Sequence, residues 1–213
     1  MIEAFFLTWL GVLAAQAAPG PNLVAVASVA LAQGRQSALW VVGGVASGML
    51  VWSLGTAFGL GALLTAFPLS LVAMKLLGGG YLLYLGLRAA RTTLRGAGAP
   101  TIGAGDGALP TAGAAWRRGL LVVLTNPKAA LMWAAVATFL FGLGLTPLQV
   151  LAFGPVGAVS GLAVYGTYAL LFSTGLAMRG YARFARAVEG AFAAAFATMG
   201  GGLVWSGLRD LRS

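Results

Sequence analysis

The sequence predicts an all-α membrane protein with six transmembrane helices, arranged as two inverted three-helix repeats with helices 1 and 4 broken at proline motifs. Of the 213 residues, 60% are hydrophobic and only 8% are charged, whereas a soluble domain carries roughly 25% charged residues. Mean hydropathy is +0.92. Long apolar segments recur along the chain, and two of them, one in each half, are interrupted by proline.

The apolar segments set the predicted spans, because about 20 residues of α-helix cross the hydrocarbon core. The spans are 4–31, 39–65, 69–88, 118–141, 148–177 and 190–208. The first and fifth exceed this length, so we expect them to tilt, break or extend beyond the membrane. The chain is predicted to be one transmembrane domain, with repeat 1 at 1–95, a Gly-, Ala- and Pro-rich cytoplasmic loop at 96–117 and repeat 2 at 118–213.

An internal similarity supports the two halves. The segment Gly79–Arg88 ends the third predicted span, and Gly200–Arg209 ends the sixth. At one constant offset two glycines, Leu82 with Leu203 and the closing Gly-Leu-Arg all match. Three spans in each half is an odd number, so the second half must be inverted. Inverted repeats recur in transporters, with the substrate site at their interface.

The distribution of Lys and Arg predicts the orientation, because cytoplasmic connections of membrane proteins are enriched in these residues. On one side of a six-span chain the connections hold Arg35, Arg88, Arg91, Arg95, Arg117, Arg118, Arg179, Arg183 and Arg186, and the other side holds Arg209 and Arg212. Both termini are therefore predicted to be periplasmic or extracellular, in a bacterial inner membrane. The net charge of +9 follows from this pattern, so we expect a lipid bilayer and no nucleic acid as partner.

Residue types that are missing exclude several functions. The chain has no Cys and no His, which removes disulfides, the commonest metal ligand and the usual proton carrier near neutral pH. The acidic residues, Glu3, Asp106, Glu189 and Asp210, fall at termini or in predicted loops. No carboxylate is thus expected deep in the membrane, and we expect no metal, no cofactor and no enzyme. A cleaved signal peptide is disfavoured because its first residues would hold Glu3 and no Lys or Arg.

The motif Asn126-Pro127-Lys128 lies inside the fourth span. Asn is a favoured N-cap and Pro is favoured at the first helical position, so the motif predicts the start of a half-helix. Such a start presents unpaired N–H groups and a positive dipole end, which suit an anion such as a carboxylate. Lys128 adds a full charge. The alternative is a kinked helix whose Lys128 reaches the cytoplasmic face.

The motif Pro19-Gly20-Pro21-Asn22 interrupts the first span in a similar way. Two prolines around a glycine cannot continue a helix, and Pro21 can begin the second half-helix. The Asn22 amide offers a donor and an acceptor, and Gln16 precedes the motif. A purely structural kink is the alternative for this motif.

Other polar, small and aromatic residues give weaker signals. Lys75 lies in the third span, and it is a candidate site residue or a side chain that reaches outward. Glycine pairs spaced by four predict close helix packing more than ligand contact; they are Gly44 with Gly48, Gly55 with Gly59 and Gly157 with Gly161. The Trp residues and Tyr81, Tyr84, Tyr165 and Tyr168 are candidates to line a site, although packing or interfacial anchoring is the expected role for most of them.

With these motifs the chain resembles the lysine exporter (LysE/RhtB) family of bacterial amino-acid exporters over nearly its whole length. The strongest parts are Pro19-Gly20-Pro21-Asn22, the stretch from Lys75 to Gly86, and Asn126-Pro127-Lys128. The resemblance implies efflux of amino acids or close derivatives, driven by ion gradients of the membrane. Its matching positions for function are the two proline motifs.

The chain departs from the family at two places. Many members have an acidic residue beside the first proline motif, where this chain has Asn22 followed by Leu23. Many also carry a Pro-Gln pair late in span four, where this chain has Thr138 and Phe139. Fold and family do not fix the ligand.

We therefore expect an alternating-access exporter of small neutral amino acids or their derivatives, with its site between the two broken helices. Without a buried carboxylate the site should disfavour lysine and arginine. Three alternatives remain open for how export is coupled to an ion gradient. Lys128 could carry the proton, Glu3 could move inward in the fold, or export could be facilitated and need no coupling. The alternatives are export of another solute or a metal ion, and a membrane scaffold without transport. A homodimer is the candidate assembly.

Overall fold

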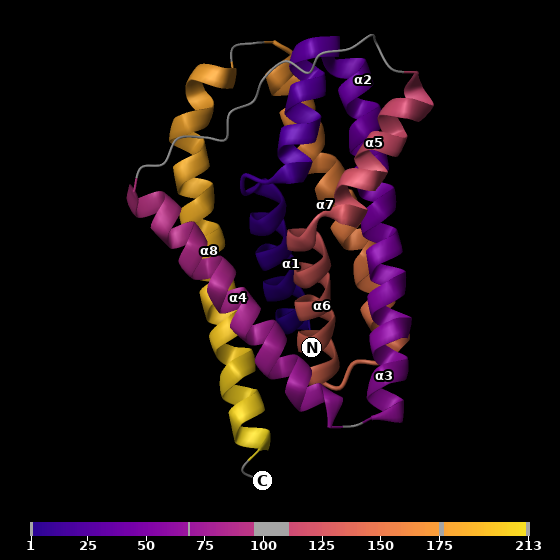
Figure 1. Cartoon of the computed structure of the whole chain (residues 1–213), viewed down its shortest axis with the longest axis vertical. Coiled ribbons are helices and arrows are strands. Elements are labelled where there is room, and N and C mark those ends of the chain that lie inside the picture. The colour runs from indigo at the N-terminus through magenta and orange to yellow at the C-terminus, as the bar shows by residue number, and fades with distance from the viewer. Residues whose placement is uncertain (1, 68, 96–110, 175–176, 212–213) are drawn as a thin grey trace.

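A computed structural model describes residues 2–67, 69–95, 111–174 and 177–211, and these form helices joined by short connections (Figure 1). The helices are α1 Ile2–Ala17, α2 Pro21–Leu54, a π-helical segment η1 Gly55–Leu60, α3 Gly61–Ala66, α4 Ser70–Arg95, α5 Ala112–Thr125, α6 Pro127–Gly142, α7 Pro147–Ser173 and α8 Ala177–Asp210. The described residues contain no strand, so the all-α prediction is confirmed.

The two predicted helix breaks are confirmed. Helix α1 ends at Ala17 and α2 begins at Pro21, with Gly20 as its extended N-cap residue. Helix α5 ends at Thr125 and α6 begins at Pro127. Each proline occupies the first helical position, where its missing N–H removes no helical hydrogen bond. The axes of α5 and α6 differ by 65°.

The helices extend beyond several predicted boundaries, because polar residues at these places do not end the helix. The connection around Arg35 is a kink: α2 runs through it, and Gly34 alone is non-helical, with φ 81°. This left-handed backbone favours glycine. Helix α5 already begins at Ala112 and α8 at Ala177, before the predicted sixth span. The rest of the predicted central loop, 96–110, lies outside the described residues.

Two of the described helices are long and apolar enough to cross a bilayer, Pro21–Leu63 and Pro147–Ser173. Helices α5 and α6 make a third span if the bent pair is counted as one. The arrangement as six spans in two inverted repeats stays a prediction.

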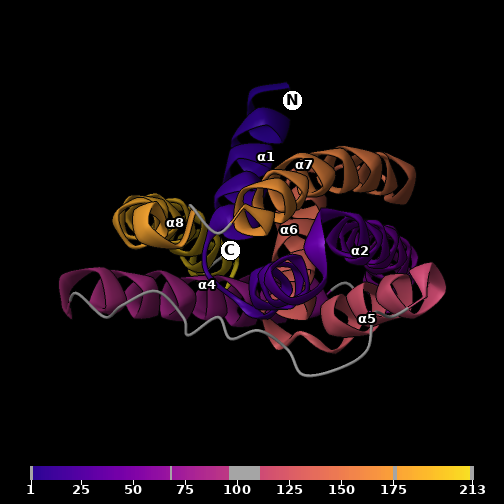
Figure 2. The ribbon, with the colours of Figure 1, turned by 90° about the horizontal axis from the view of Figure 1, so that it is seen from above.

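The helices form two groups, seen from above in Figure 2. Helix α4 packs along α8 on one side, and α2 packs against α5 and α7 on the other, with α1 and α6 between the groups. The core among α1, α2, α6 and α7 is built from small and β-branched residues with a few aromatic rings such as Phe153, which is fully buried. Side chains of this size let helix backbones approach closely.

Glycine packing is confirmed at two of the three predicted pairs. A Cβ at Gly44 would overlap the Trp116 carbonyl of α5, and one at Gly48 would overlap the Val123 side chain. The Gly157 and Gly161 positions pack against Trp133 and Met49. For Gly55 and Gly59 the prediction is wrong: both are exposed on the π-helical segment, and no described atom lies within 4 Å of an added Cβ.

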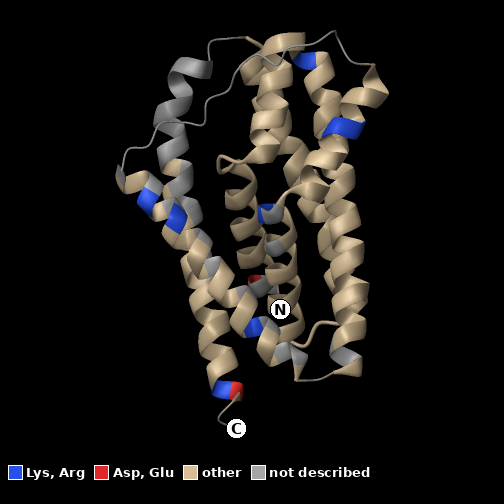
Figure 3. Ribbon diagram, viewed as in Figure 1, with Lys and Arg blue, Asp and Glu red and all other residues tan. Residues whose placement is uncertain are grey.

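The charged side chains are distributed unevenly along the molecule. Figure 3 shows most of the described Lys and Arg toward the end where α4 ends and α5 begins. Both chain termini lie toward the opposite end (Figure 1). Side chains in the segment with Arg179, Arg183 and Arg186 are outside the described set.

Candidate functional site

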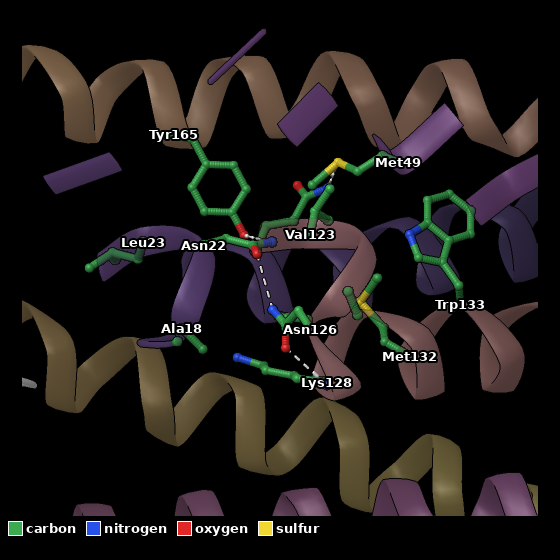
Figure 4. A pocket seen from close by; sticks show the side chains of 14 residues that line it. Ala18, Asn22, Leu23, Met49, Val123, Asn126, Lys128, Met132, Trp133 and Tyr165 are labelled. Carbon is green, nitrogen blue, oxygen red and sulfur yellow. Dashed lines mark hydrogen bonds between the residues drawn. The ribbon is translucent and has the colours of Figure 1, made fainter. Parts of the chain in front are cut away.

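The two helix breaks, far apart in the sequence, meet through a pair of asparagines. The Asn126 side-chain amide donates a hydrogen bond to the side-chain oxygen Oδ1 of Asn22 at 3.0 Å. Asn22 in turn donates to the Tyr165 hydroxyl on α7 at 3.4 Å (Figure 4). Asn22 and Asn126 are both buried. A buried amide pair of this kind is held in register by its partners and fixes the two helix starts side by side.

Asn126 also caps α6, as its sequence predicted. Its side-chain oxygen accepts from the Lys128 backbone N–H at 3.0 Å. Helix α2, by contrast, begins at an extended glycine with no side-chain cap. The N-terminal ends of α2 and α6, each carrying a partial positive charge, therefore lie next to each other.

Lys128 points across the site toward the first break. Its ammonium lies 3.4 Å from the Pro19 carbonyl oxygen, and its side chain is half-buried. Nζ would also lie 3.5 Å from a Cβ at Gly20. Lys128 thus links α6 to the α1–α2 break, and it does not extend away from the breaks as an outward-reaching lysine would.

The end of α1 supplies carbonyl oxygens to the same region. The last carbonyls of a helix have no partner within the helix. The Tyr168 hydroxyl of α7 donates to the Ala17 carbonyl at 2.7 Å, and Lys128 donates to that of Pro19. Positive helix starts and a negative helix end therefore meet at one place.

Gln16 and Trp133 add buried polar groups to the site. Gln16 Nε2 donates to the Gly157 carbonyl at 2.8 Å and contacts Met49 Sδ at 3.6 Å. Among the described residues, Gln16 Oε1 and Trp133 Nε1 are buried and have no hydrogen-bond partner.

These side chains surround a small cavity (Figure 4). Its volume is about 20 Å³, which is room for about one water molecule. The lining comes from both breaks and from α1, α2, α5, α6 and α7: Ala15, Gln16, Ala18, Gly20, Asn22, Leu23, Met49, Val123, Asn126, Lys128, Ala129, Met132, Trp133 and Tyr165. No group of His, Cys, Asp or Glu that could hold a metal ion occurs among the residues that the structure describes.

Most of the site residues predicted from the sequence come together at this cavity. Gln16, Gly20, Asn22, Asn126 and Lys128 line it. Pro19 contributes its carbonyl, while Pro21 and Pro127 act as the first residues of α2 and α6. Tyr165 and Trp133 were expected to pack or anchor, and both line the cavity; the sequence held no signal that separated them from the other aromatic residues.

Lys75 lies apart from this cavity. It is 6% exposed, and its ammonium lies 2.6 Å from an Asp210 carboxylate oxygen and 3.1 Å from the Ser206 hydroxyl, both on α8. The Lys75 side chain therefore forms an ion pair with Asp210 in the last turn of α8. This contact joins α4 to α8.

We expect Asp210→Asn to lower the free energy of unfolding, because it leaves the Lys75 charge buried without its partner. Removing one partner of a fully buried pair costs roughly 3–5 kcal/mol. Asp210 is 31% exposed, so about 1–3 kcal/mol is expected here. Thermal unfolding in detergent measures it. The control is Lys75→Met combined with Asp210→Leu, which removes both charges and should recover most of the loss; equal instability of both variants would contradict the prediction.

The chain is similar to known proteins over nearly its whole length. The model of the LysE type translocator family matches residues 13–207. The chain is 27% identical to the threonine efflux protein of Salmonella typhi and to that of Escherichia coli K12, in each case over 94% of this chain and 97% of the relative. It is 26% identical to a membrane protein of Haemophilus influenzae, over 91% of this chain and 92% of the relative.

No solved structure matches the chain. The family match nevertheless covers both helix breaks, the whole cavity, helix α4 and α8 as far as residue 207. The chain belongs to the LysE type translocator family.

Proposed function

We propose that this protein exports small neutral amino acids across the bacterial inner membrane by alternating access, with its substrate site between the two broken helices. The observation that carries the proposal is the meeting of the breaks: Asn126 is bonded to Asn22, and Lys128 reaches the Pro19 carbonyl. Broken helices that meet at an inverted-repeat interface form the substrate sites of several transporter folds. The threonine efflux relatives support an amino acid as the substrate.

The substrate carboxylate is placed at the start of α6. There the positive helix ends of α2 and α6 and the Lys128 ammonium act on the same point. A carboxylate at such a point gains charge-assisted hydrogen bonds, which are roughly twice as strong as neutral ones. Lys128 would exchange its contact with the Pro19 carbonyl for the carboxylate.

The substrate ammonium is placed at the opposite side, near the carbonyl oxygens at the end of α1 and the Asn22 side chain. Carbonyls of a helix end can hold one positive charge. A second positive charge on the substrate side chain would meet the Lys128 charge, and the described residues that line the cavity include no Asp or Glu to offset it. Neutral substrates are therefore favoured over lysine and arginine.

The size of the cavity supports alternating access. At about 20 Å³ it holds about one water, so helices must separate to admit an amino acid. The breaks supply candidate hinges, because few hydrogen bonds cross an extended segment such as the one at Gly20. The Lys and Arg distribution supports an orientation with both termini periplasmic.

Efflux from proteoliposomes tests the proposal. Labelled threonine, valine, leucine, lysine and arginine are loaded at equal concentration, with and without an imposed proton gradient. We expect efflux of the neutral amino acids at rates at least about tenfold above those of lysine and arginine, because burying a second uncompensated charge costs more than 1.4 kcal/mol. Preferential lysine export would overturn the neutral substrate. Absence of all amino-acid efflux by folded protein would favour another solute or a scaffold.

A further inference from the structure

Two polar atoms at the cavity lack hydrogen-bond partners among the described residues, Gln16 Oε1 and Trp133 Nε1. Both side chains are only 2% exposed, and both line the cavity. Buried polar groups in native proteins are nearly always paired, and each exception asks for an explanation. A bound ligand that supplies the missing partners is one such explanation.

The orientation of the Gln16 amide is fixed by its neighbour. Its nitrogen donates to the Gly157 carbonyl oxygen at 2.8 Å. Turning the amide over would place two oxygens, both acceptors, against each other. Oε1 therefore remains as an acceptor at the cavity.

Trp133 supplies the complementary group. An indole nitrogen can only donate a hydrogen bond. Figure 4 shows this nitrogen on the side of the ring that faces Met49 and Val123, and Met49 also contacts Gln16. Both side chains adjoin Gly157: Gln16 bonds its carbonyl, and ring atoms of Trp133 lie 3.2 and 3.3 Å from an added Cβ there. The free acceptor and the free donor thus come from side chains that line the same cavity and adjoin the same glycine.

We propose that Gln16 and Trp133 bind the side-chain hydroxyl of the transported amino acid, so that the preferred substrates are neutral and hydroxylated. This inference rests on the proposed amino-acid export. A hydroxyl both donates and accepts, so it satisfies Gln16 Oε1 and Trp133 Nε1 together. A methyl group satisfies neither, an ammonium only donates, and a carboxylate only accepts.

Selectivity for a hydroxyl can be large because the protein's own polar groups enforce it. A site built to bond a hydroxyl rejects the analogue without it, since the buried partners are then left unpaired. Threonine and valine differ by one hydroxyl in place of one methyl. We expect the wild-type protein to prefer threonine over valine by roughly 10- to 100-fold in competition.

The first measurement needs no variant. Unlabelled threonine and valine compete against efflux of labelled threonine from proteoliposomes, and serine against alanine gives a second matched pair. The expected result is a lower half-inhibitory concentration for the hydroxylated member of each pair. Equal inhibition by threonine and valine, with threonine efflux intact, would overturn the hydroxyl site and leave the proposed export standing. Absence of all amino-acid efflux would overturn both.

The second measurement assigns the donor. Trp133→Phe keeps the aromatic ring and removes the N–H, so we expect the threonine-to-valine preference to fall about 5- to 30-fold. Trp205→Phe is the matched control, because Trp205 is exposed on α8 and its replacement should leave the preference unchanged. A preference unaltered in folded Trp133→Phe would contradict the role of the indole. If that variant does not fold, the competition in the wild type still decides for or against a hydroxyl site.

Discussion

Replacing Lys128 with methionine is expected to lower amino-acid efflux at least about 30-fold, the largest effect we predict for a single change. The ammonium is half-buried beside the carbonyl of Pro19 and the start of α6. Truncating one partner of a desolvated charge pair costs roughly 2–5 kcal/mol, and in the proposed site the partner is the substrate carboxylate. Methionine keeps the length and apolar character of the side chain. Initial efflux rates from proteoliposomes, at equal amounts of folded protein, measure the loss.

Lys128→Arg is the matched control for the charge. Arginine retains the positive charge but spreads it over a larger planar group, so we expect partial export with a raised substrate concentration for half-maximal rate. Lys128→Met also removes the contact with the Pro19 carbonyl, so thermal unfolding of both variants is measured beside their export. If Lys128→Met exports at the wild-type rate, Lys128 has no part in substrate binding and its contact with Pro19 is structural.

Local chemistry predicted the helix breaks well. Pro21 and Pro127 cannot lie inside a helix without loss of a hydrogen bond, and Asn126 is a strong N-cap, so the breaks follow from neighbours in the sequence alone. The kink at Gly34 was read as a connection because an arginine follows it, although one glycine in the left-handed region bends the helix without ending it.

Contacts between distant residues could not be predicted in the same way. Lys75 gave no hint of Asp210, since nothing local marks a partner near the other end of the chain. Trp133 resembled the other tryptophans of the sequence. What sets Trp133 apart is that its indole nitrogen lies beside the cavity without a hydrogen-bond partner among the described residues. This depends on how its ring packs against Gly157, which is distant in the sequence. The sequence thus predicted where the helices break and leave backbone groups without helical hydrogen bonds. The structure was needed to find which side chains lie near these groups.

The second large effect is expected for Asn126→Ala. This side chain caps α6 through the Lys128 N–H and also donates to Asn22 across the two breaks. Loss of an N-cap alone costs about 1 kcal/mol of stability. Loss of the hydrogen bond to Asn22 also lets the starts of α2 and α6 shift relative to each other. Small displacements of binding groups can lower rates about 100-fold. We therefore expect export to fall at least about tenfold, with only a modest fall in melting temperature.

Thr146→Ala separates these two consequences, because Thr146 caps α7 through the Gln149 N–H at an exposed turn away from the cavity. It should cost a similar amount of stability, about 1 kcal/mol, and leave export near the wild-type rate. Equal losses of export in both variants would mean that helix capping in general, and not the contact between the breaks, supports transport. A loss confined to Asn126→Ala would instead make the bond between Asn22 and Asn126 the link through which one broken helix positions the other around the substrate.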